Sequence, residues 1–588
     1  MRRRPNKPDL RLLLPVAAAW AAAALGVTQP PVVTALVSLA LATAVAIHLI
    51  MSQPRRRGPS SPFDTFAQHP NPTSIMLPGS LWPLRPRQAA TPLQPEPQHS
   101  GVCMILLVSA VLGLSAAVHT AAAASGPVAA LAARSTYVDS LLTVTGDPRQ
   151  IAPSPDGHRP ALAVLPVRVT EITTGDGTTY RVGASATVLA RLTPGSSGPP
   201  ATSVLPASSN SSTASTAPAR AAPTTASWLD LLPSEHIAVR GKLVPPKPGT
   251  RDAATIFADR PPVLLGGPST VQAIAGALRT DLRDATSGLP ADPAGVLPAL
   301  AVGDTSREPP DLAEAFKRTG LTYLTVASGE NLMFLTGALL PAARRLGVRG
   351  RTVTAFSFLV ILGFTALARP GPPMVRATVM SLIGSTAALF GRRCRALPAM
   401  AAAALILLLL DPWLARAYGF ALSVAATAGL LIAAPGWYAR LVDRGVPGWI
   451  AGPAAITAAC EVFCEPLLVT FTGSLPLLAV PANILAAPAA PPATVLGVMA
   501  MAGYALWPPL GRLLAWVGQW PVRWICLVAR TGAGVPGAAI GWPRGPAGCL
   551  ALLGAYVIFG ALWTRRAQRK RSARSRRRLA NGHESVTA

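Results

Sequence analysis

The feature that most constrains this chain is a series of apolar runs, each about as long as a bilayer is thick. Three runs, at residues 12–27, 32–51 and 102–124, precede a long polar stretch, and more follow from Leu321 onward. About 20 helical residues cross the roughly 30 Å hydrocarbon core of a membrane. Only 13% of the 588 residues are charged, whereas a soluble protein carries about 25%. The sequence therefore predicts a polytopic α-helical membrane protein and excludes a soluble globular one.

Nine further spans are predicted after the polar stretch, which brings the total to about 12. Their ranges are 321–341, 353–368, 374–390, 398–410, 415–435, 449–471, 475–490, 492–510 and 546–563. Basic clusters follow every second span, as at Arg344 and Arg345 or at Arg392 and Arg393. Because Lys and Arg are kept on the cytoplasmic side, we expect a cell-membrane protein with both termini in the cytoplasm and residues 125–320 outside.

This topology explains much of the formal net charge of +27. Nine basic residues lie in 565–578 alone, and five lie in the first eleven positions. Basic segments beside a membrane orient the helices and contact anionic lipid, so membrane lipids are expected partners. The excess of Lys and Arg therefore gives almost no evidence for or against nucleic-acid binding.

The polar stretch carries the pattern of a small β-domain. Residues 161–172 and 180–191 are rich in β-branched residues and flank the turn signal Gly175-Asp176-Gly177. Composition divides the chain into N-terminal transmembrane helices (1–124) with a disordered cytoplasmic loop (58–100), an extracytoplasmic β-domain (125–270) with a Ser/Thr/Pro-rich insertion (195–227), amphipathic helices (271–320), a transmembrane domain (321–563) and a basic cytoplasmic tail (564–588). The pattern leaves open whether the amphipathic helices lie on the membrane or cap the β-domain.

Residues that would support metal or cofactor chemistry are scattered. The seven His residues occur singly, and Cys460 and Cys464, four residues apart, have no second ligand pair at a suitable spacing. No phosphate-binding Gly-x-x-x-x-Gly-Lys-Ser/Thr motif occurs. We therefore expect no metal, no cofactor, and neither nuclease nor ATPase activity in this chain.

Polar residues inside the apolar runs are the candidates for function. A charged side chain costs roughly 2.5–3.5 kcal/mol at the centre of a membrane helix, so it marks a bundle interior or an aqueous path. Glu461 and Glu465 share a helix face, which also fits a solvated helix end, and Asp411 before Pro412 also fits a surface turn. The candidates are Ser328, Gly329, Glu330, Asn331, Arg376, Asp411, Glu461, Glu465 and Asn483.

Four segments resemble the ComEC competence family, the inner-membrane channel for DNA uptake. Residues 313–331, AEAFKRTGLTYLTVASGEN, resemble its F-x-x-T-G-L-x-H-L-x-A-V-S-G-x-N/H signature. Residues 373–377 then resemble P-S-V-x-R-A, 411–423 resemble D-P-x…G-F-x-L-S, and 481–488 resemble N-x-x-A-x-P, in the family's order. The resemblance covers most of residues 125–563.

This resemblance implies a channel that imports single-stranded DNA during natural transformation, with an OB-like extracytoplasmic β-domain. The implied DNA path comprises Tyr323, Ser328, Gly329, Glu330, Asn331, Arg376, Asp411, Glu461 and Asn483. Arg240, Lys242 and Arg251 are implied DNA contacts outside the membrane. Longer family members carry a C-terminal metallo-β-lactamase-like domain, and we expect a form without it. A separate DNA receptor, an ATP-driven motor and a separate nuclease are then expected partners, and a homo-oligomer stays open.

Two departures from the family pattern keep other functions open. Tyr323 stands where the family has His, and Glu330 stands where small or apolar residues are usual. A negative charge in the path would repel phosphate unless a cation such as Arg376 neutralises it. A pore for another solute, or a non-conducting homologue, is the second hypothesis. A membrane enzyme is the third, and it requires Glu330, Glu461 and Asp411 to converge in one pocket.

Overall fold

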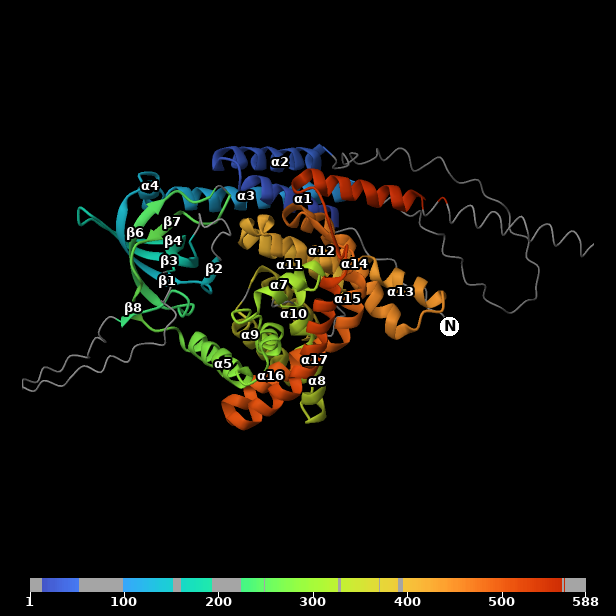
Figure 1. Ribbon diagram of the computed structural model, residues 1–588. Helices are drawn as coiled ribbons and strands as arrows, with labels where there is room; N and C mark the ends of the chain where they lie inside the picture. Colours follow the sequence, from blue (N-terminus) through green and yellow to red (C-terminus); the bar gives the residue numbers. More distant parts are fainter. Residues whose placement is uncertain are drawn as a thin grey trace, which may run out of the picture.

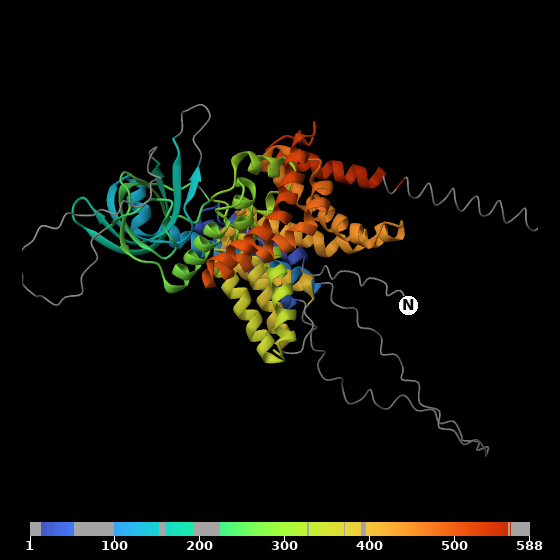
Figure 2. The ribbon, with the colours of Figure 1, turned by 60° about the horizontal axis from the view of Figure 1, so that its bottom comes forward.

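The computed structural model describes residues 13–51, 99–151, 160–192, 224–247, 249–325, 329–369, 371–389 and 395–562, together with Arg565. Ser328 lies outside the described residues, as do the side chain of Glu330, almost all of the predicted loop 58–100 and most of the predicted insertion 195–227. Of the predicted tail 564–588, only Arg565 is described. The described chain forms a β-barrel to one side of a large helical region (Figures 1 and 2).

The β-domain is an eight-stranded mixed sheet. Its strands are β1 (Tyr137–Val144), β2 (Arg149–Ile151), β3 (Leu162–Thr174), β4 (Thr179–Arg191), β5 (Thr224–Thr225), β6 (His236–Val244), β7 (Ala254–Ala258) and β8 (Val263–Gly266). The order β1-β3-β4-β7-β6 closes on itself because β6 also pairs with β1. All of these pairings are antiparallel except β4 with β7. Five strands therefore form a closed barrel, with β2, β5 and β8 at its margins.

Alternating side chains fill the barrel, as the strand pattern predicts. Along β1, every second residue is buried, and β6 repeats this alternation. At Gly241 in β6, an added Cβ would collide with the backbone carbonyl oxygen of Phe257 in β7. Only glycine allows the two strands to approach so closely at this point. The short helix α4 (Pro127–Ala133) precedes β1 and buries Val128 in the same core.

Seventeen labelled helices account for most of the remaining described residues. Before the barrel come α1 (Leu13–Gly26), α2 (Pro31–Met51) and α3 (His99–Ala124). After it come α5 (Thr270–Thr286), α6 (Ala291–Val302), α7 (Pro310–Arg318), α8 (Gly329–Arg345), α9 (Arg351–Leu367), α10 (Pro372–Leu389), α11 (Ala396–Leu410), α12 (Tyr418–Ile432), α13 (Ala434–Asp443), α14 (Gly448–Thr472), α15 (Ala479–Ala486), α16 (Ala490–Leu506) and α17 (Pro508–Gly534). A further helix spans Gly545–Leu562.

The largest core lies between the helices that follow the barrel. It joins α5, α6 and α7 to α8, α9, α16 and α17. Every residue from Gly295 to Val302 of α6 is buried, because α5, α16 and α17 pack around this helix. The amphipathic helices α5 and α7 are therefore part of the helical core.

The N-terminal helices pack on the later ones in a separate core. The ring of Trp20 in α1 stacks on Phe420 of α12, with 5.0 Å between ring centroids. Its Nε1 donates a 2.8 Å hydrogen bond to the carbonyl oxygen of Ala415. Residues from α1, α3, α11 and α12 complete this core, so segments about 400 residues apart in the chain are joined in one body.

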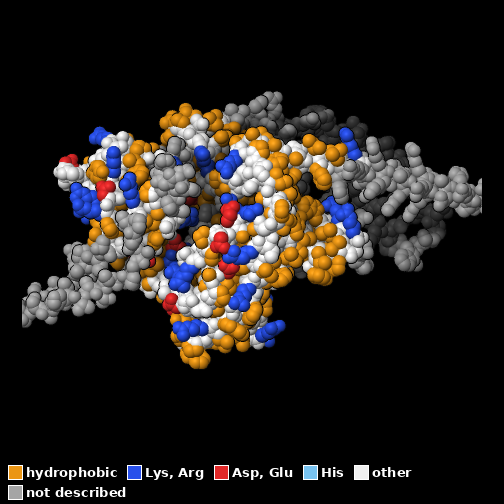
Figure 3. Space-filling view, in the orientation of Figure 1, with side chains coloured by type: hydrophobic (Ala, Val, Ile, Leu, Met, Phe, Trp, Pro, Cys, Tyr) orange, Lys and Arg blue, Asp and Glu red, His pale blue; other side chains and the backbone are white. Residues whose placement is uncertain are grey.

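Membrane-spanning character is clear for some helices. Among the described residues, Met104–Ala124, Gly448–Thr472, Ala479–Leu506 and Gly545–Leu562 are long and apolar enough to cross a membrane, and α12 with α13 adds a fifth span if that bent pair is one. Several shorter apolar helices accompany them, including α9 and α11. Hydrophobic side chains are spread over the helical region in the view of Figure 3. The apolar helices are those of a membrane protein.

One pair of predicted spans is wrong. The ranges 475–490 and 492–510 were expected as two spans, but Ala479–Leu506 is one helical run of 28 residues. Pro491 and Pro492 suggest a break in the sequence, yet they lie in the first turn of α16, where a missing N–H costs no hydrogen bond. By its length and composition this run is one candidate span.

Candidate functional site

Three of the predicted site residues form a hydrogen-bonded chain across three elements. The hydroxyl of Tyr323 donates to Oδ1 of Asn483 at 2.7 Å. Nδ2 of Asn483 in turn donates to Oε1 of Glu461 at 3.4 Å. Asn483 is fully buried in α15, Glu461 lies in α14, and Tyr323 lies in a 3-10 turn, Thr322–Leu324, that precedes α8. The fold thus brings motif residues that are 160 positions apart into direct contact.

A second carboxylate lies one helical turn from Glu461. Glu465 is 5% exposed, and neither of its side-chain oxygens has a hydrogen-bond partner. The alternative of a solvated helix end does not describe this pair, because α14 places it inside the helical region. Cys460 and Cys464 of the same helix direct their Sγ atoms to carbonyl oxygens of Ala426 and Leu422 in α12, each at 3.5 Å. The cysteines therefore help join α14 to α12.

Arg376 forms a second polar group where α8, α10 and α12 meet. Its side chain is 6% exposed, and Nε donates to Oγ of Ser423 at 2.9 Å. An added Cβ at Gly329 would lie 2.5 Å from Cβ of Ala377 and 3.9 Å from Nη2 of Arg376. Gly329 is therefore needed for the close approach of α8 to α10. The sequence motif predicted these residues, and the helix packing explains why one is glycine.

Asn331 and Asp411 lie apart from both groups. The Nδ2 of Asn331 donates to the carbonyl oxygen of Leu300 in α6 at 3.0 Å, which ties α8 to the buried helix. Asp411 accepts from the backbone N–H of Trp413 at 3.2 Å, as expected for a turn before proline. Its other oxygen lies 3.1 Å from Nη1 of Arg251 in the β6–β7 loop of the barrel. Asp411 therefore marks the boundary between the barrel and the helices.

The three predicted DNA contacts on the barrel have different surroundings. Arg240 is exposed on β6, with its Nε 3.8 Å from Asp139 of β1. Lys242 is half-buried on the same strand, where it pairs with Tyr137 and Phe257 on the neighbouring strands. Only Arg251 faces the helical region, through Asp411. The structure thus separates two residues of the barrel wall from one at the domain boundary.

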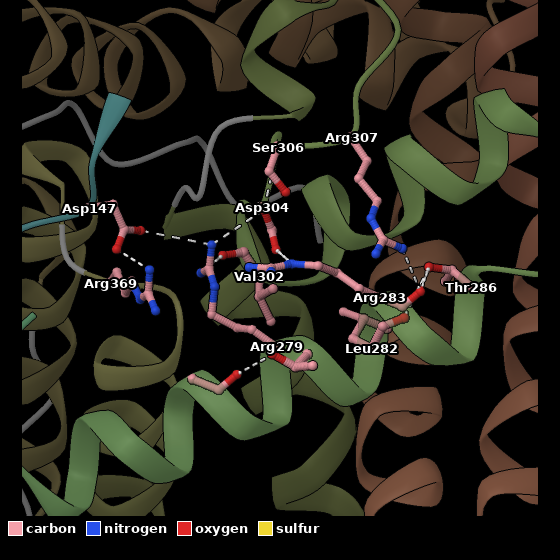
Figure 4. Close-up of polar contacts among 12 residues, drawn as sticks. Asp147, Arg279, Leu282, Arg283, Thr286, Val302, Asp304, Ser306, Arg307 and Arg369 are labelled. Carbon is pink, nitrogen blue, oxygen red and sulfur yellow. Dashed lines mark hydrogen bonds and ion pairs between the residues drawn. The ribbon is translucent and has the colours of Figure 1, made fainter. Parts of the chain in front are cut away.

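A cluster of charged residues that sequence reasoning missed also lies at this boundary. Asp147 of the β1–β2 loop pairs with Arg369 after α9, and Arg279 of α5 pairs with Asp304 after α6 (Figure 4). Burial acts to raise the pKa of Asp304, but the Arg279 and Arg283 guanidinium groups outweigh it and hold that pKa at about 2. The one signal in the sequence was the spacing of Arg279 and Arg283, four residues apart on an amphipathic helix.

The arrangement suits polar recognition more than metal chemistry. Within the described ranges, no three His, Cys, Asp or Glu side chains lie close enough together to hold a metal ion. Asp411 and Glu461 have different partners, Arg251 and Asn483, so these two do not form the convergent pair that a membrane enzyme would need.

Comparison with known proteins connects this region to one family. Residues 300–567 match the family model described as "Competence protein". Over 200 residues the chain is 24% identical to ComE operon protein 3 of Bacillus subtilis (strain 168). That match covers 34% of this chain and only 25% of the Bacillus protein, so the chain spans about a quarter of the length of this relative. No solved structure gives a significant match.

Proposed function

We propose that this chain, a ComEC-like competence protein, conducts single-stranded DNA across the cytoplasmic membrane during natural transformation. The observation that carries the proposal is the bond between Tyr323 and Asn483. It joins two of the four family-like segments inside an apolar helical region. Buried polar residues in such a region are costly and mark the interior of a path rather than a lipid-facing surface.

The charge of the substrate explains why a protein path is needed. Each nucleotide carries a negative charge, and about 30 Å of hydrocarbon excludes it unless polar groups line an aqueous route. Arg376, bonded to Ser423, supplies a buried cation on this proposed route, and Asn331 and Asn483 supply further buried polar groups. In the proposed path, the guanidinium group offsets the charge of passing phosphates.

The barrel is proposed as an OB-like module that receives DNA outside the membrane. An OB-fold is a five-stranded Greek-key barrel whose loops bind oligonucleotides. The closed order β1-β3-β4-β7-β6 supports this assignment. Arg240 and Lys242 are the proposed contacts on its wall, and Arg251 is the proposed contact at its helical end.

The remaining expectations complete the proposal. The chain lies in the cell membrane as a multi-pass protein, with its two basic termini in the cytoplasm and residues 125–320 outside. A separate receptor delivers the DNA, a cytoplasmic ATP-driven motor pulls it, and a separate nuclease removes the other strand. Membrane lipids contact the basic segments, and a homo-oligomer is one possible assembly.

A pore for another solute is the second candidate. The Glu461 and Glu465 carboxylates favour it, because two buried acidic groups repel phosphate and attract a cation or a proton. The two candidates predict different transported species when Asn483 and Arg376 are intact. The first predicts single-stranded DNA, and the second predicts a cation or a proton. A membrane enzyme has less support, since Asp411 and Glu461 have separate partners.

Deletion and complementation in the native host test the proposal. Cells lacking this gene are expected to bind labelled DNA but to import none into a nuclease-protected form. The wild-type gene should restore import, whereas Arg376→Ala should not restore it despite normal amounts of membrane-inserted protein. Import that is unaffected by the deletion would reject the DNA-channel proposal.

A further inference from the structure

The barrel and the helical region meet through charged side chains at one end of the barrel. The β1–β2 loop contributes Asp147, and the β6–β7 loop contributes Arg251. Asp147 pairs with Arg369 and lies 3.9 Å from Nη2 of Arg279, while Arg251 pairs with Asp411. Ionic contacts of this kind can be exchanged for other ions more easily than an apolar interface can.

The cluster around Asp147 has more positive than negative groups. Three guanidinium groups, from Arg279, Arg283 and Arg369, surround two carboxylates, from Asp147 and Asp304 (Figure 4). One positive charge is therefore in excess, and the Arg279 side chain that carries part of it is only 5% exposed. A cluster with net positive charge favours an anionic ligand over a neutral one.

Two hydrogen-bond donors in the cluster have no acceptor. The Nε atoms of Arg279 and Arg369 are both buried without a partner in the structure. The Nη1 atom of Arg279 donates to the carbonyl oxygens of Val302 and Leu367, each at 3.3 Å, which fixes the guanidinium group in place. Most buried donors in proteins find an acceptor. These two N–H groups therefore indicate a site for an anion that accepts hydrogen bonds from them.

The two carboxylates are held to different degrees. Asp304 is 4% exposed, accepts from Nε of Arg283 at 2.8 Å and accepts from the backbone N–H of Ser306 at 3.2 Å. Asp147 is 31% exposed and reaches the cluster from a loop of the other domain. Asp304 is thus a fixed part of the helical region, whereas Asp147 is the more accessible of the two carboxylates.

We propose that this cluster is a phosphodiester-binding site, in which a phosphate of single-stranded DNA replaces the Asp147 carboxylate on Arg279 and Arg369. The inference rests on the proposed function and places the first phosphate contact after the barrel. Phosphate and carboxylate oxygens accept from the same planar guanidinium fork, so one can substitute for the other. Arg369 adopts the left-handed region, with φ of +53°, which is unfavourable for a residue with a side chain.

Binding of a labelled single-stranded oligonucleotide to the purified full-length protein, measured by fluorescence anisotropy at fixed salt, tests the site. Asp147→Asn should bind the oligonucleotide about 3–10-fold more tightly than wild type, because a competing carboxylate is removed. The control Asp176→Asn makes the same charge change at an exposed hairpin turn, where Asp176 accepts from Thr174 and Thr178 of its own hairpin. It should leave the affinity within about twofold of wild type.

A second variant assigns the gain to the arginines. Adding Arg369→Gln to Asp147→Asn should remove the gain in affinity. The comparison uses variants whose thermal unfolding matches that of the wild type, because an unfolded basic chain binds DNA non-specifically. Equal affinities for Asp147→Asn and Asp176→Asn, or a gain that survives Arg369→Gln, would overturn the inference. If the inference is overturned but the wild-type protein still binds and imports DNA, the proposed function stands. If the wild-type gene also fails to restore import in the deletion strain, the proposed function is rejected as well.

Discussion

The hydroxyl of Tyr323 donates a 2.7 Å hydrogen bond to Oδ1 of Asn483, and Nδ2 of Asn483 donates to Oε1 of Glu461. Tyr323 occupies the position at which the ComEC pattern has His. Tyr323, which departs from the family pattern, is therefore hydrogen-bonded to Asn483, which agrees with the pattern. Tyrosine and histidine can both donate a hydrogen bond at this place, so the departure is compatible with the same local arrangement.

Removal of this hydroxyl should disturb the site. Tyr323→Phe leaves a buried acceptor on Asn483 without its donor, which costs about 1–3 kcal/mol. We expect a lower melting temperature of the purified protein and at least a tenfold drop in transformation, whereas Tyr323→His should retain most of both. Tyr418→Phe is the matched control, because the Tyr418 ring packs on Phe471. A Tyr323→Phe variant that behaves like this control would contradict the role of the bond.

Gly329 should be hard to replace, because α8 and α10 approach each other closely at this residue. Gly329→Ala would place a methyl group 2.5 Å from Cβ of Ala377, which forces α8 and α10 apart at a cost of about 1–3 kcal/mol. Ala377→Gly should rescue this variant by removing the opposing methyl group. Gly337→Ala has no neighbour within 4 Å of its new Cβ and should be neutral. Thermal unfolding of the four proteins checks the prediction, and failure of the rescue would show that close packing is not the cause.

Glu461 should be needed as a hydrogen-bond acceptor. Glu461→Gln keeps an oxygen that can accept from Nδ2 of Asn483, and we expect transformation close to wild type. Glu461→Leu removes the acceptor and leaves the Asn483 donor unpaired in a buried place, with an expected loss of about 1–3 kcal/mol in stability. Comparison of the two variants by thermal unfolding and transformation separates hydrogen bonding from charge. Equal defects in both would indicate instead that the negative charge itself is required.

Low pH should reduce the stability of the folded protein by protonating Asp304, near the boundary between the barrel and the helices. Its pKa is held at about 2 in the folded protein, against 3.8 for the unperturbed group. The unfolded state therefore binds the proton first as the pH falls, and the stabilisation, about 2 kcal/mol, is present above pH 4 and is lost between about pH 4 and 2. Asp304→Asn should reduce the dependence of the melting temperature on pH in this window. An unchanged dependence in the variant would show that Asp304 is not its source.

The sequence was sufficient where a signal is local. Residues 161–172 and 180–191 alternate as strands do, and they form β3 and β4 around the predicted turn. The apolar runs likewise indicated a membrane protein. Between residues 475 and 510, two spans were expected, whereas the structure has one helical run. Proline in the first turn of a helix cannot be distinguished in the sequence from proline at a helix break.

Contacts between distant segments were beyond the reach of the sequence. Asp147 and Arg369 are 222 positions apart and lie at the ends of a barrel loop and a helix, so neither periodicity nor a motif connects them. The same is true of Arg251 with Asp411, which are separated by 160 positions. Tyr323, Arg376 and Asn483 could be selected because each stands in a family-like segment, but their grouping into a hydrogen-bonded chain and a separate arginine site needed the packing of α8, α10, α14 and α15.

Site-specific photo-crosslinking during DNA uptake tests the central claim most directly. A photoreactive amino acid at position 423, beside the Arg376 guanidinium group, should crosslink to transforming single-stranded DNA in living cells. The same probe at position 359, where Leu359 is 68% exposed on the outside of α9, should not. Crosslinking at 423 that depends on Arg376 would support a DNA path through the helical region. DNA import without any crosslink at 423, or with equal crosslinking at 359, would contradict it.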